Sequence, residues 1–192
     1  MKRFMILSIA FAFLMFSCKT AEFGFKVINV NGMVYDFTNR PVANCEISLG
    51  KRYKSSTDIN GRFSISGVPY GSYTITGHKK FLEHYSDEVT IKDKGQIIYI
   101  RMPSQNQLLG MADEALSANN MVMAQEMLER AYSIDQNNIE MLFYYAALKF
   151  RQREYGPAMR LLESARNLGS KDIYIEKFLT KLREVQDEVQ EN

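Results

Sequence analysis

The chain has 192 residues, of which 46% are apolar, so it can bury one or two small hydrophobic cores. Its formal net charge is +2, and no run of Lys and Arg is longer than two, which argues against a nucleic-acid-binding surface. Trp is absent, so 11 Tyr and 12 Phe supply the aromatic side chains.

The N-terminus has the pattern of an export signal. Lys2 and Arg3 precede the hydrophobic segment FMILSIAFAFLMF, residues 4–16. This segment is shorter than the stretch of about 20 residues that a membrane-spanning helix needs. We therefore expect residues 1–17 to be a signal peptide.

A small residue precedes a cysteine at the end of this segment, in Leu14-Met15-Phe16-Ser17-Cys18. The segment resembles the lipobox of bacterial lipoproteins, although Met15 and Phe16 replace its usual Leu and small residue. The resemblance implies cleavage between Ser17 and Cys18 and lipid attachment at Cys18. The protein would then be anchored to a membrane of the bacterial cell envelope and be periplasmic or surface-facing. An ordinary secretory signal that contains a cysteine is the alternative.

Residues 18–28 are expected to be a tether between the lipid and the first domain. Nine residues lead from Cys18 to Val27, so the tether spans at most about 30 Å. The other cysteine, Cys45, alternates with polar neighbours, which predicts a buried thiol on a strand. No base lies near it in the sequence, so we expect no catalytic role.

Apolar and polar residues alternate with period two across residues 27–102, and we assign the first domain to residues 29–103. Seven short candidate strands are separated by Gly, Pro, Asn and Asp, and they lie near 30–35, 44–49, 51–57, 61–66, 72–77, 86–92 and 97–102. This pattern predicts a seven-stranded antiparallel β-sandwich.

The stretch TDINGRFSISGVPYGSY, residues 57–73, contains the most turn residues. An EF-hand calcium loop that began at Asp58 would need Gly at its sixth position and Glu at its twelfth, where this chain has Phe and Pro. We therefore expect a turn in which Asp58 and Asn60 bind backbone N–H groups and Gly61 adopts a positive φ.

The strings NGMVYD, RPVANCEISLG, STDINGRFSISGVPYGSYTI and QIIYIRM, within residues 30–102, resemble a carboxypeptidase regulatory-like domain. The resemblance implies a transthyretin-like sandwich that lies beside another domain and is not itself a peptidase. The two histidines, His78 and His84, flank KKFLE, which we expect to be a solvated loop. We expect no enzyme activity, bound metal, cofactor or small-molecule substrate.

After Pro103, helix-forming residues replace the alternating pattern. Ser104 and Gln107 predict a capping box at the first helix, while Pro157 and Gly169 fit the start and end of the fourth. Five helices are expected near 105–118, 121–133, 139–152, 156–168 and 171–189. The fold class is therefore α+β in two separate domains, with an all-α domain at 104–192.

The helical part repeats its pattern of small and large apolar residues every 34 residues. Positions Ala124, Leu128, Ala131, Leu108 and Ala112 recur as Ala158, Leu162, Ala165, Leu142 and Ala146. Residues 105–172 resemble two tetratricopeptide repeats, whose period is 34. The usual first-helix Trp, Gly and Tyr are mostly missing, and the closing Pro is absent. A generic pair of helical hairpins is the alternative.

The final helix carries one apolar stripe of Ile175, Phe178, Leu182, Val185 and Val189. We expect this helix to cap the open end of the repeats, which a short solenoid needs. A coiled-coil dimer is the alternative use of the stripe.

The tetratricopeptide resemblance also implies a partner-binding groove formed by the first helix of each repeat. Its register assigns six candidates to the groove: Leu109, Asp113, Leu116, Phe143, Ala147 and Phe150. These positions are mostly apolar, so the groove either receives an amphipathic segment of a partner or is partly filled by the final helix.

Together these features predict a lipid-anchored, non-catalytic interaction or scaffold protein of the bacterial envelope. Its partners would be a membrane, through the N-terminal lipid, and a protein, through the helical domain. An accessory subunit of an outer-membrane assembly or secretion machine is one alternative. A metal-dependent envelope hydrolase, or an accessory protein of one, is the other.

Overall fold

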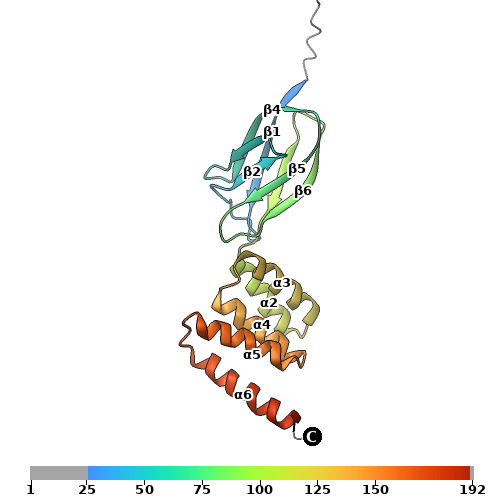
Figure 1. Ribbon diagram of the computed structural model, residues 1–192. Coiled ribbons are helices and arrows are strands. Elements are labelled where there is room, and N and C mark those ends of the chain that lie inside the picture. Colours follow the sequence, from blue (N-terminus) through green and yellow to red (C-terminus); the bar gives the residue numbers. More distant parts are fainter. Residues whose placement is uncertain (1–25, 191–192) are drawn as a thin grey trace, which may run out of the picture.

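A computed structural model describes residues 26–190 of the chain. A β-sandwich of seven strands comes first, and five helices follow it in a stack (Figure 1). The expected signal peptide, Ser17, Cys18 and most of the tether lie outside the described residues. Within residues 26–190, no helix combines the length and the apolar character that crossing a membrane requires.

The seven strands match the predicted ones within a few residues. They are β1 (Val27–Tyr35), β2 (Glu46–Leu49), β3 (Tyr53–Ser56), β4 (Arg62–Pro69), β5 (Gly71–His78), β6 (Tyr85–Ile91) and β7 (Ile97–Arg101). They form a three-stranded sheet in the order β4-β1-β7 and a four-stranded sheet in the order β3-β2-β5-β6. The prediction of a seven-stranded sandwich is confirmed.

The sequence pattern predicts a wholly antiparallel sandwich, but one pair of strands in the structure is parallel. β1 pairs with β7 in parallel, from Asn31 opposite Ile97 to Tyr35 opposite Arg101. All the other strand pairs are antiparallel. Because the chain reverses direction between successive strands, all odd-numbered strands run the same way. Two odd-numbered strands placed side by side must therefore be parallel.

The inward-facing residues of both sheets form the first hydrophobic core. Its members are fully or almost fully buried apolar side chains, including Val30, Val34, Cys45, Ile47, Leu49, Phe63, Ile65, Ile75, Ile91 and Ile100. Met102, at the end of β7, is also completely buried. This core follows directly from the period-two pattern, since alternate residues of a strand face the same side.

The five helices are α2 (Gln105–Ser117), α3 (Met121–Ile134), α4 (Ile139–Arg151), α5 (Tyr155–Asn167) and α6 (Ile173–Gln190). The expected capping box opens α2, because the Gln107 N–H donates to Ser104 Oγ and the Ser104 N–H donates to Gln107 Oε1. Gly169 follows α5 with a φ of 92°, as a helix stop requires.

The helices share a second hydrophobic core, built from the positions that recur at the 34-residue spacing. These positions are all buried: Leu108, Ala112, Ala124, Leu128, Ala131, Leu142, Ala146, Ala158, Leu162 and Ala165. Helices that follow one another in the sequence pack against each other, and α2 also contacts α4. The alanines permit this close approach of neighbouring helices.

The apolar stripe of α6 faces the rest of the helices. Ile175 and Leu182 are buried, and Phe178 packs against the same core. Leu179, which the expected stripe had omitted, is completely buried as well. The side chain of Val189 lies outside the described part. The stripe therefore contributes to the core of the helices.

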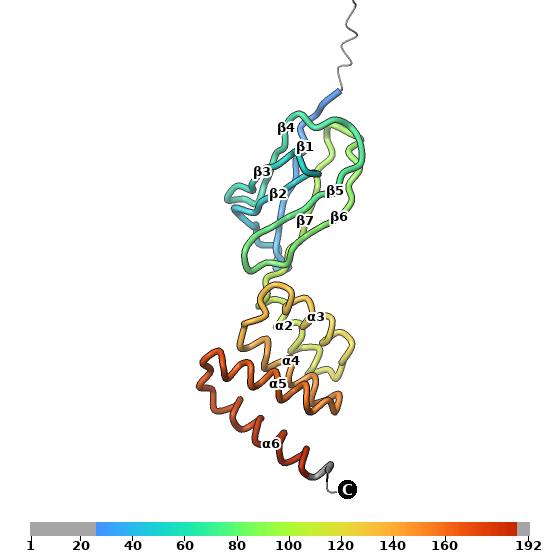
Figure 2. The backbone as a smooth tube through the Cα atoms, in the orientation of Figure 1, coloured from blue at the N-terminus to red at the C-terminus, as the bar shows by residue number. Residues whose placement is uncertain are grey.

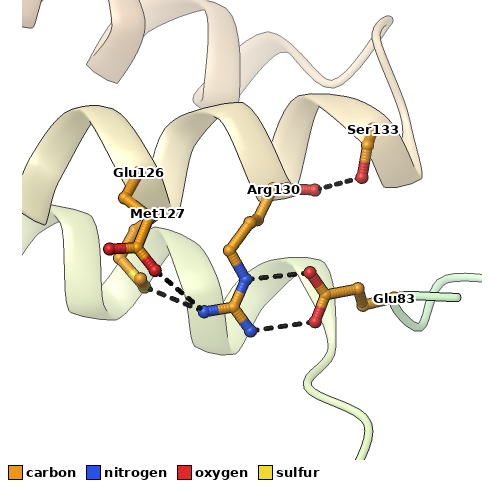
Figure 3. A network of polar contacts seen from close by, with 5 residues as sticks. All are labelled: Glu83, Glu126, Met127, Arg130 and Ser133. Atoms are coloured by element: carbon orange, nitrogen blue, oxygen red, sulfur yellow. Dashed lines mark hydrogen bonds and ion pairs between the residues drawn. The ribbon is translucent and has the colours of Figure 1, made fainter. Parts of the chain in front are cut away.

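The two cores meet at a polar junction around residues 81–84 and 102–107. The Glu83 N–H donates to the Pro103 carbonyl at 2.9 Å, and the Gln105 N–H donates to the Phe81 carbonyl at 3.3 Å. Arg130 of α3 donates two hydrogen bonds to the carboxylate of Glu83, at 2.8 and 2.9 Å (Figure 3). The loop KKFLE is therefore a contact with the helices as well as a surface turn.

Candidate partner-binding site

The six residues assigned to the groove do not share one accessible surface. Leu109 and Leu116 expose only 2% and 4% of their area and belong to the helical core. This corrects their assignment to a partner-binding face, because α3 and α4 pack over the side of α2 that carries them. Asp113 is exposed, and it is the α2 candidate that a partner can reach.

The three candidates from α4, which are Phe143, Ala147 and Phe150, are half-buried. The ring of Phe178 on α6 lies 5.9 Å from that of Phe143 and 5.4 Å from that of Phe150, both close to edge-on. Such aromatic pairs add to the stability of a packed interface. The final helix therefore fills much of this face itself.

A second surface, on the other side of α4, remains open. Residues of an α-helix are 100° apart, so Tyr145 and Lys149 project away from Phe143 and Phe150. They border a cleft of about 420 Å³ between α3 and α5. Its lining is Glu129, Tyr132, Tyr145, Lys149, Pro157, Arg160, Leu161 and Ser164, and we call it the α3–α5 cleft.

The lining of the α3–α5 cleft combines aromatic and charged side chains. The rings of Tyr132 and Tyr145 meet edge-on with their centres 6.3 Å apart. Lys149 Nζ lies 5.9 Å from the centre of the Tyr145 ring and forms an ion pair of 3.1 Å with Glu154. Burial raises the pKa of Tyr145, and the negative charge of Glu129 raises it further. Tyr145 therefore remains a neutral hydrogen-bonding group at physiological pH.

The α3–α5 cleft was not predicted from the sequence. Its residues come from three helices and follow no single spacing, and the 34-residue register placed the binding face on the first helices only. One local signal was present, because Tyr145 and Lys149 lie four residues apart and so share a helix face. That spacing cannot reveal that Tyr132 and Leu161 lie opposite them.

The turn at Asp58 has the geometry expected of a structural turn. Asp58 Oδ1 accepts hydrogen bonds of 2.8 Å from the N–H groups of Asn60 and Arg62. Gly61 has a φ of 72°, and its carbonyl accepts from the Val34 N–H at 2.8 Å. The predicted positive φ of Gly61 is confirmed.

The remaining titratable groups do not assemble a reactive centre within residues 26–190. His78 and His84 lie beside each other with ring centres 6.2 Å apart. In that segment of the chain no cluster of three or more His, Cys, Asp and Glu could hold a metal ion. Cys45 is a free, completely buried thiol, and burial raises its pKa. A raised pKa disfavours the reactive thiolate.

No protein-family model matches this sequence, and no curated protein matches it either. Among solved structures, a chain from a type II cohesin–X-dockerin complex of Acetivibrio cellulolyticus, an N-terminal interface mutant, is 22% identical with a TM-score of 0.36. That match covers 43% of this chain and 62% of the other. BcpA, the major pilin subunit of Bacillus cereus, is 19% identical with a TM-score of 0.34, over 41% of this chain and 28% of its own. The Bacillus anthracis TIE protein is 10% identical with a TM-score of 0.34, over 41% of this chain and 16% of its own. These likenesses assign no function to the chain.

Proposed function

We propose that this protein is a lipid-anchored, non-catalytic interaction or scaffold protein of the bacterial cell envelope. Residues 29–103 would form a carboxypeptidase regulatory-like domain, and residues 104–192 a tetratricopeptide-like domain that binds a protein partner. The observation that carries the proposal is the α3–α5 cleft, an open aromatic surface on helices whose other candidate face α6 covers.

The chemistry of the cleft favours a short apolar segment of a protein. Tyr132, Tyr145 and Leu161 offer a broad contact area, and tyrosines combine an apolar ring with a hydroxyl that can pair with a partner. Arg160 is exposed at the edge of the cleft, where it can pair with an acidic residue next to the anchoring side chain. An aromatic pocket edged by charges is typical of the centre of a binding interface.

The envelope location rests on the sequence alone. The hydrophobic segment at 4–16 and Ser17-Cys18 support lipid attachment at Cys18, with a diacylglycerol on its thiol and a further acyl chain on its amine. Two or more chains anchor a protein stably, whereas one alone binds a membrane only reversibly. Palmitate labelling tests this aspect of the proposal. The full chain should take up label and the Cys18→Ala variant should not, and labelling of that variant would rule out this anchor.

The binding of a partner is tested by affinity purification from detergent-solubilised envelopes, with Tyr132→Ala compared against Tyr174→Ala. Both variants remove one tyrosine ring from a helix, but Tyr174 is 66% exposed on α6, away from the cleft. The partner should be lost with Tyr132→Ala and kept with Tyr174→Ala, while circular dichroism shows that both variants stay helical. Full retention by Tyr132→Ala would show that the cleft is not the interaction surface. Recovery of a stoichiometric multiprotein complex would identify the protein as an accessory subunit.

A further inference from the structure

The start of β1, the β4–β5 turn and the β6–β7 turn lie at the same end of the sandwich. Val27 pairs with Pro69 at the end of β4, and Gly71 at the start of β5 pairs with Ile91 at the end of β6. The β4–β5 and β6–β7 turns therefore lie beside the residue where the described chain begins. The tube in Figure 2 shows this end, which we call the outer end, at the opposite side of the sandwich from the helices.

Three exposed lysines surround the outer end. Lys26 directly precedes β1, and Lys92 and Lys94 lie in the β6–β7 turn. Lys94 also borders a hollow of about 410 Å³ together with Val27, Ile28, Asn29 and Asn31. The shared hollow places the β6–β7 turn beside the first residues of β1.

Two more basic residues lie slightly further from the outer end, on the side toward the helices. The β2–β3 turn carries exposed Lys51 and Arg52, and the neighbouring Gly50 N–H donates to the Thr74 carbonyl at 2.8 Å. Thr74 is three residues from the start of β5, so the turn lies roughly 10 Å from the outer end. Both side chains are long enough to extend toward that end.

Few negative charges oppose these five basic groups. Asp93 lies in the β6–β7 turn itself, and Glu88 pairs with Thr74 at the level of the β2–β3 turn. Within residues 26–190 the ion pairs involve Arg130 and Lys149 on the basic side, and none involves a basic residue of the outer end. The five basic side chains are therefore exposed to solvent, and no ion pair among the described residues neutralises them.

The charge balance changes sign along the molecule. Lys and Arg outnumber Asp and Glu within residues 26–103, whereas Asp and Glu outnumber Lys and Arg within residues 104–190. A negatively charged surface therefore attracts the outer end and repels the helices. Such a distribution orients the whole molecule as well as attracting it.

We propose that the outer end is a docking surface for the anionic headgroups of a phospholipid membrane. The proposal rests on the proposed anchor for its setting, since a lipid on Cys18 would hold the outer end within about 30 Å of the bilayer. Because about 30 Å is the longest span of the tether, the lysines of the outer end can also approach the bilayer more closely, into the region about 8 Å deep at physiological salt in which the field of an anionic surface acts. The sandwich would stand upright with the helices directed away from the membrane.

The test uses residues 18–192 with Cys18→Ser, the chain that the proposed cleavage leaves but without its lipid. Sedimentation with vesicles measures the affinity of this protein for two kinds of membrane. One kind of vesicle contains equal amounts of phosphatidylglycerol and phosphatidylethanolamine, and the other contains phosphatidylcholine alone. The variant Lys26→Gln/Lys92→Gln/Lys94→Gln is compared with Lys171→Gln/Lys177→Gln/Lys181→Gln. The second variant removes the same charge from exposed lysines at the helical end.

Each lysine near an anionic membrane strengthens binding about fivefold, so the outer-end variant should bind phosphatidylglycerol vesicles about 100-fold more weakly. The helical-end variant should bind as the parent chain does, and high salt should abolish binding of both. Equal weakening of the two variants would overturn the proposal, as would equal binding of the parent chain to phosphatidylcholine. Vesicle binding is measured without the lipid, so it and palmitate labelling can fail independently.

Discussion

At the residue scale, two aspartates build the same turn at the helix-facing end of the sandwich. Asp58 accepts hydrogen bonds from the N–H groups two and four residues later, and Asp36 does the same with Thr38 and Arg40, at 2.8 and 2.9 Å. The residue three places after each aspartate has a positive φ, 72° for Gly61 and 60° for Asn39. The sequence identified the first turn through its Asn and Gly, and the second had no glycine to mark it.

Replacing Gly61 with alanine should destabilise the sandwich by about 3 kcal/mol. A Cβ at this position would lie 2.5 Å from the Val34 carbonyl oxygen, in addition to the strain of a positive φ. Gly67→Ala is the matched control, because Gly67 has a φ of 71° and no atom within 4 Å of its Cβ position. Urea denaturation of both variants measures the difference. Equal losses would mean that backbone strain alone determines the cost at Gly61.

The pKa of Asp36 should make the sandwich sensitive to acid. Burial favours the neutral acid, but hydrogen bonds from the Arg40 N–H and from Thr38 outweigh it and hold the pKa of Asp36 below its usual value. A depressed pKa means that the carboxylate stabilises the fold above pH about 4 and that this contribution is lost as pH falls through the folded-state pKa. Asp36→Asn should therefore lower the stability at pH 7 and flatten its decline in acid, as thermal unfolding across pH would show. Asp93→Asn, in the β6–β7 turn, controls for the change in net charge.

At the scale of the elements, end signals and periodicity predicted most of the secondary structure. Ser104 with Gln107 and Gly169 marked helix ends, and the alternating apolar residues marked the strands. β4 nevertheless continues to Pro69, beyond the expected 61–66, because Gly67 at a φ of 71° accommodates an irregular pairing with β1 that alternation does not reveal. The neighbours of each strand were also unpredictable, since a period-two pattern specifies which faces are buried but not which strands are adjacent.

Gln105 joins three helices and carried no recognisable signal in the sequence. Its side chain is 5% exposed, and Nε2 donates to the carbonyls of Ala131 and Asp135 at 2.9 and 2.7 Å. Its Oε1 accepts from Asn138 Nδ2 at 2.9 Å, and Asn138 in turn caps α4. One buried amide therefore ties the start of α2 to the end of α3 and the start of α4.

Gln105→Leu should cost about 1–3 kcal/mol of stability, because the Asp135 carbonyl loses its donor and the Asn138 amide loses its acceptor, while the Ala131 carbonyl keeps only the 3.4 Å hydrogen bond from the Asp135 N–H. Guanidinium unfolding followed by circular dichroism at a helical wavelength provides the measurement. The control is Gln125→Leu on α3, whose amide pairs with Glu129 and Gln152 at the surface. That variant should change stability by less than about 0.5 kcal/mol. If the two variants behaved alike, the buried amide would have no special role in joining the helices.

At the scale of the whole molecule, two hydrophobic cores are joined by polar contacts. The guanidinium of Arg130 lies 5.8 Å from the centre of the Phe37 ring and pairs with Glu83, whose hydrogen bonds raise the pKa of Arg130. Glu83 and Arg130 are 47 residues apart, and the sequence placed Glu83 in a solvated loop. The pair joins residues of the sandwich and of the helices that are far apart in the sequence, so local patterns do not predict it.

A double-mutant cycle with Glu83→Ala and Arg130→Ala should give a coupling energy of about 1 kcal/mol. The side chains of Arg130 and Glu83 are 29% and 24% exposed, and the two parallel hydrogen bonds favour a stronger interaction than a fully exposed pair would provide. The Lys149–Glu154 pair, which lies within the helices, serves as a reference cycle. Breaking the junction pair should also separate the melting of the sandwich from that of the helices. A coupling energy near zero would show that other contacts hold the sandwich and the helices together.

Pulling the two ends of the molecule apart would load β1 and β7 in shear. β1 begins at the outer end and β7 ends at the helices, so a force along the long axis slides these parallel neighbours past each other. The ladder from Asn31–Ile97 to Tyr35–Arg101 then resists as one unit, whereas strands pulled from the same end would lose their hydrogen bonds singly, in succession. Tension along the long axis therefore acts on the whole β1–β7 ladder at once, and not on one hydrogen bond after another.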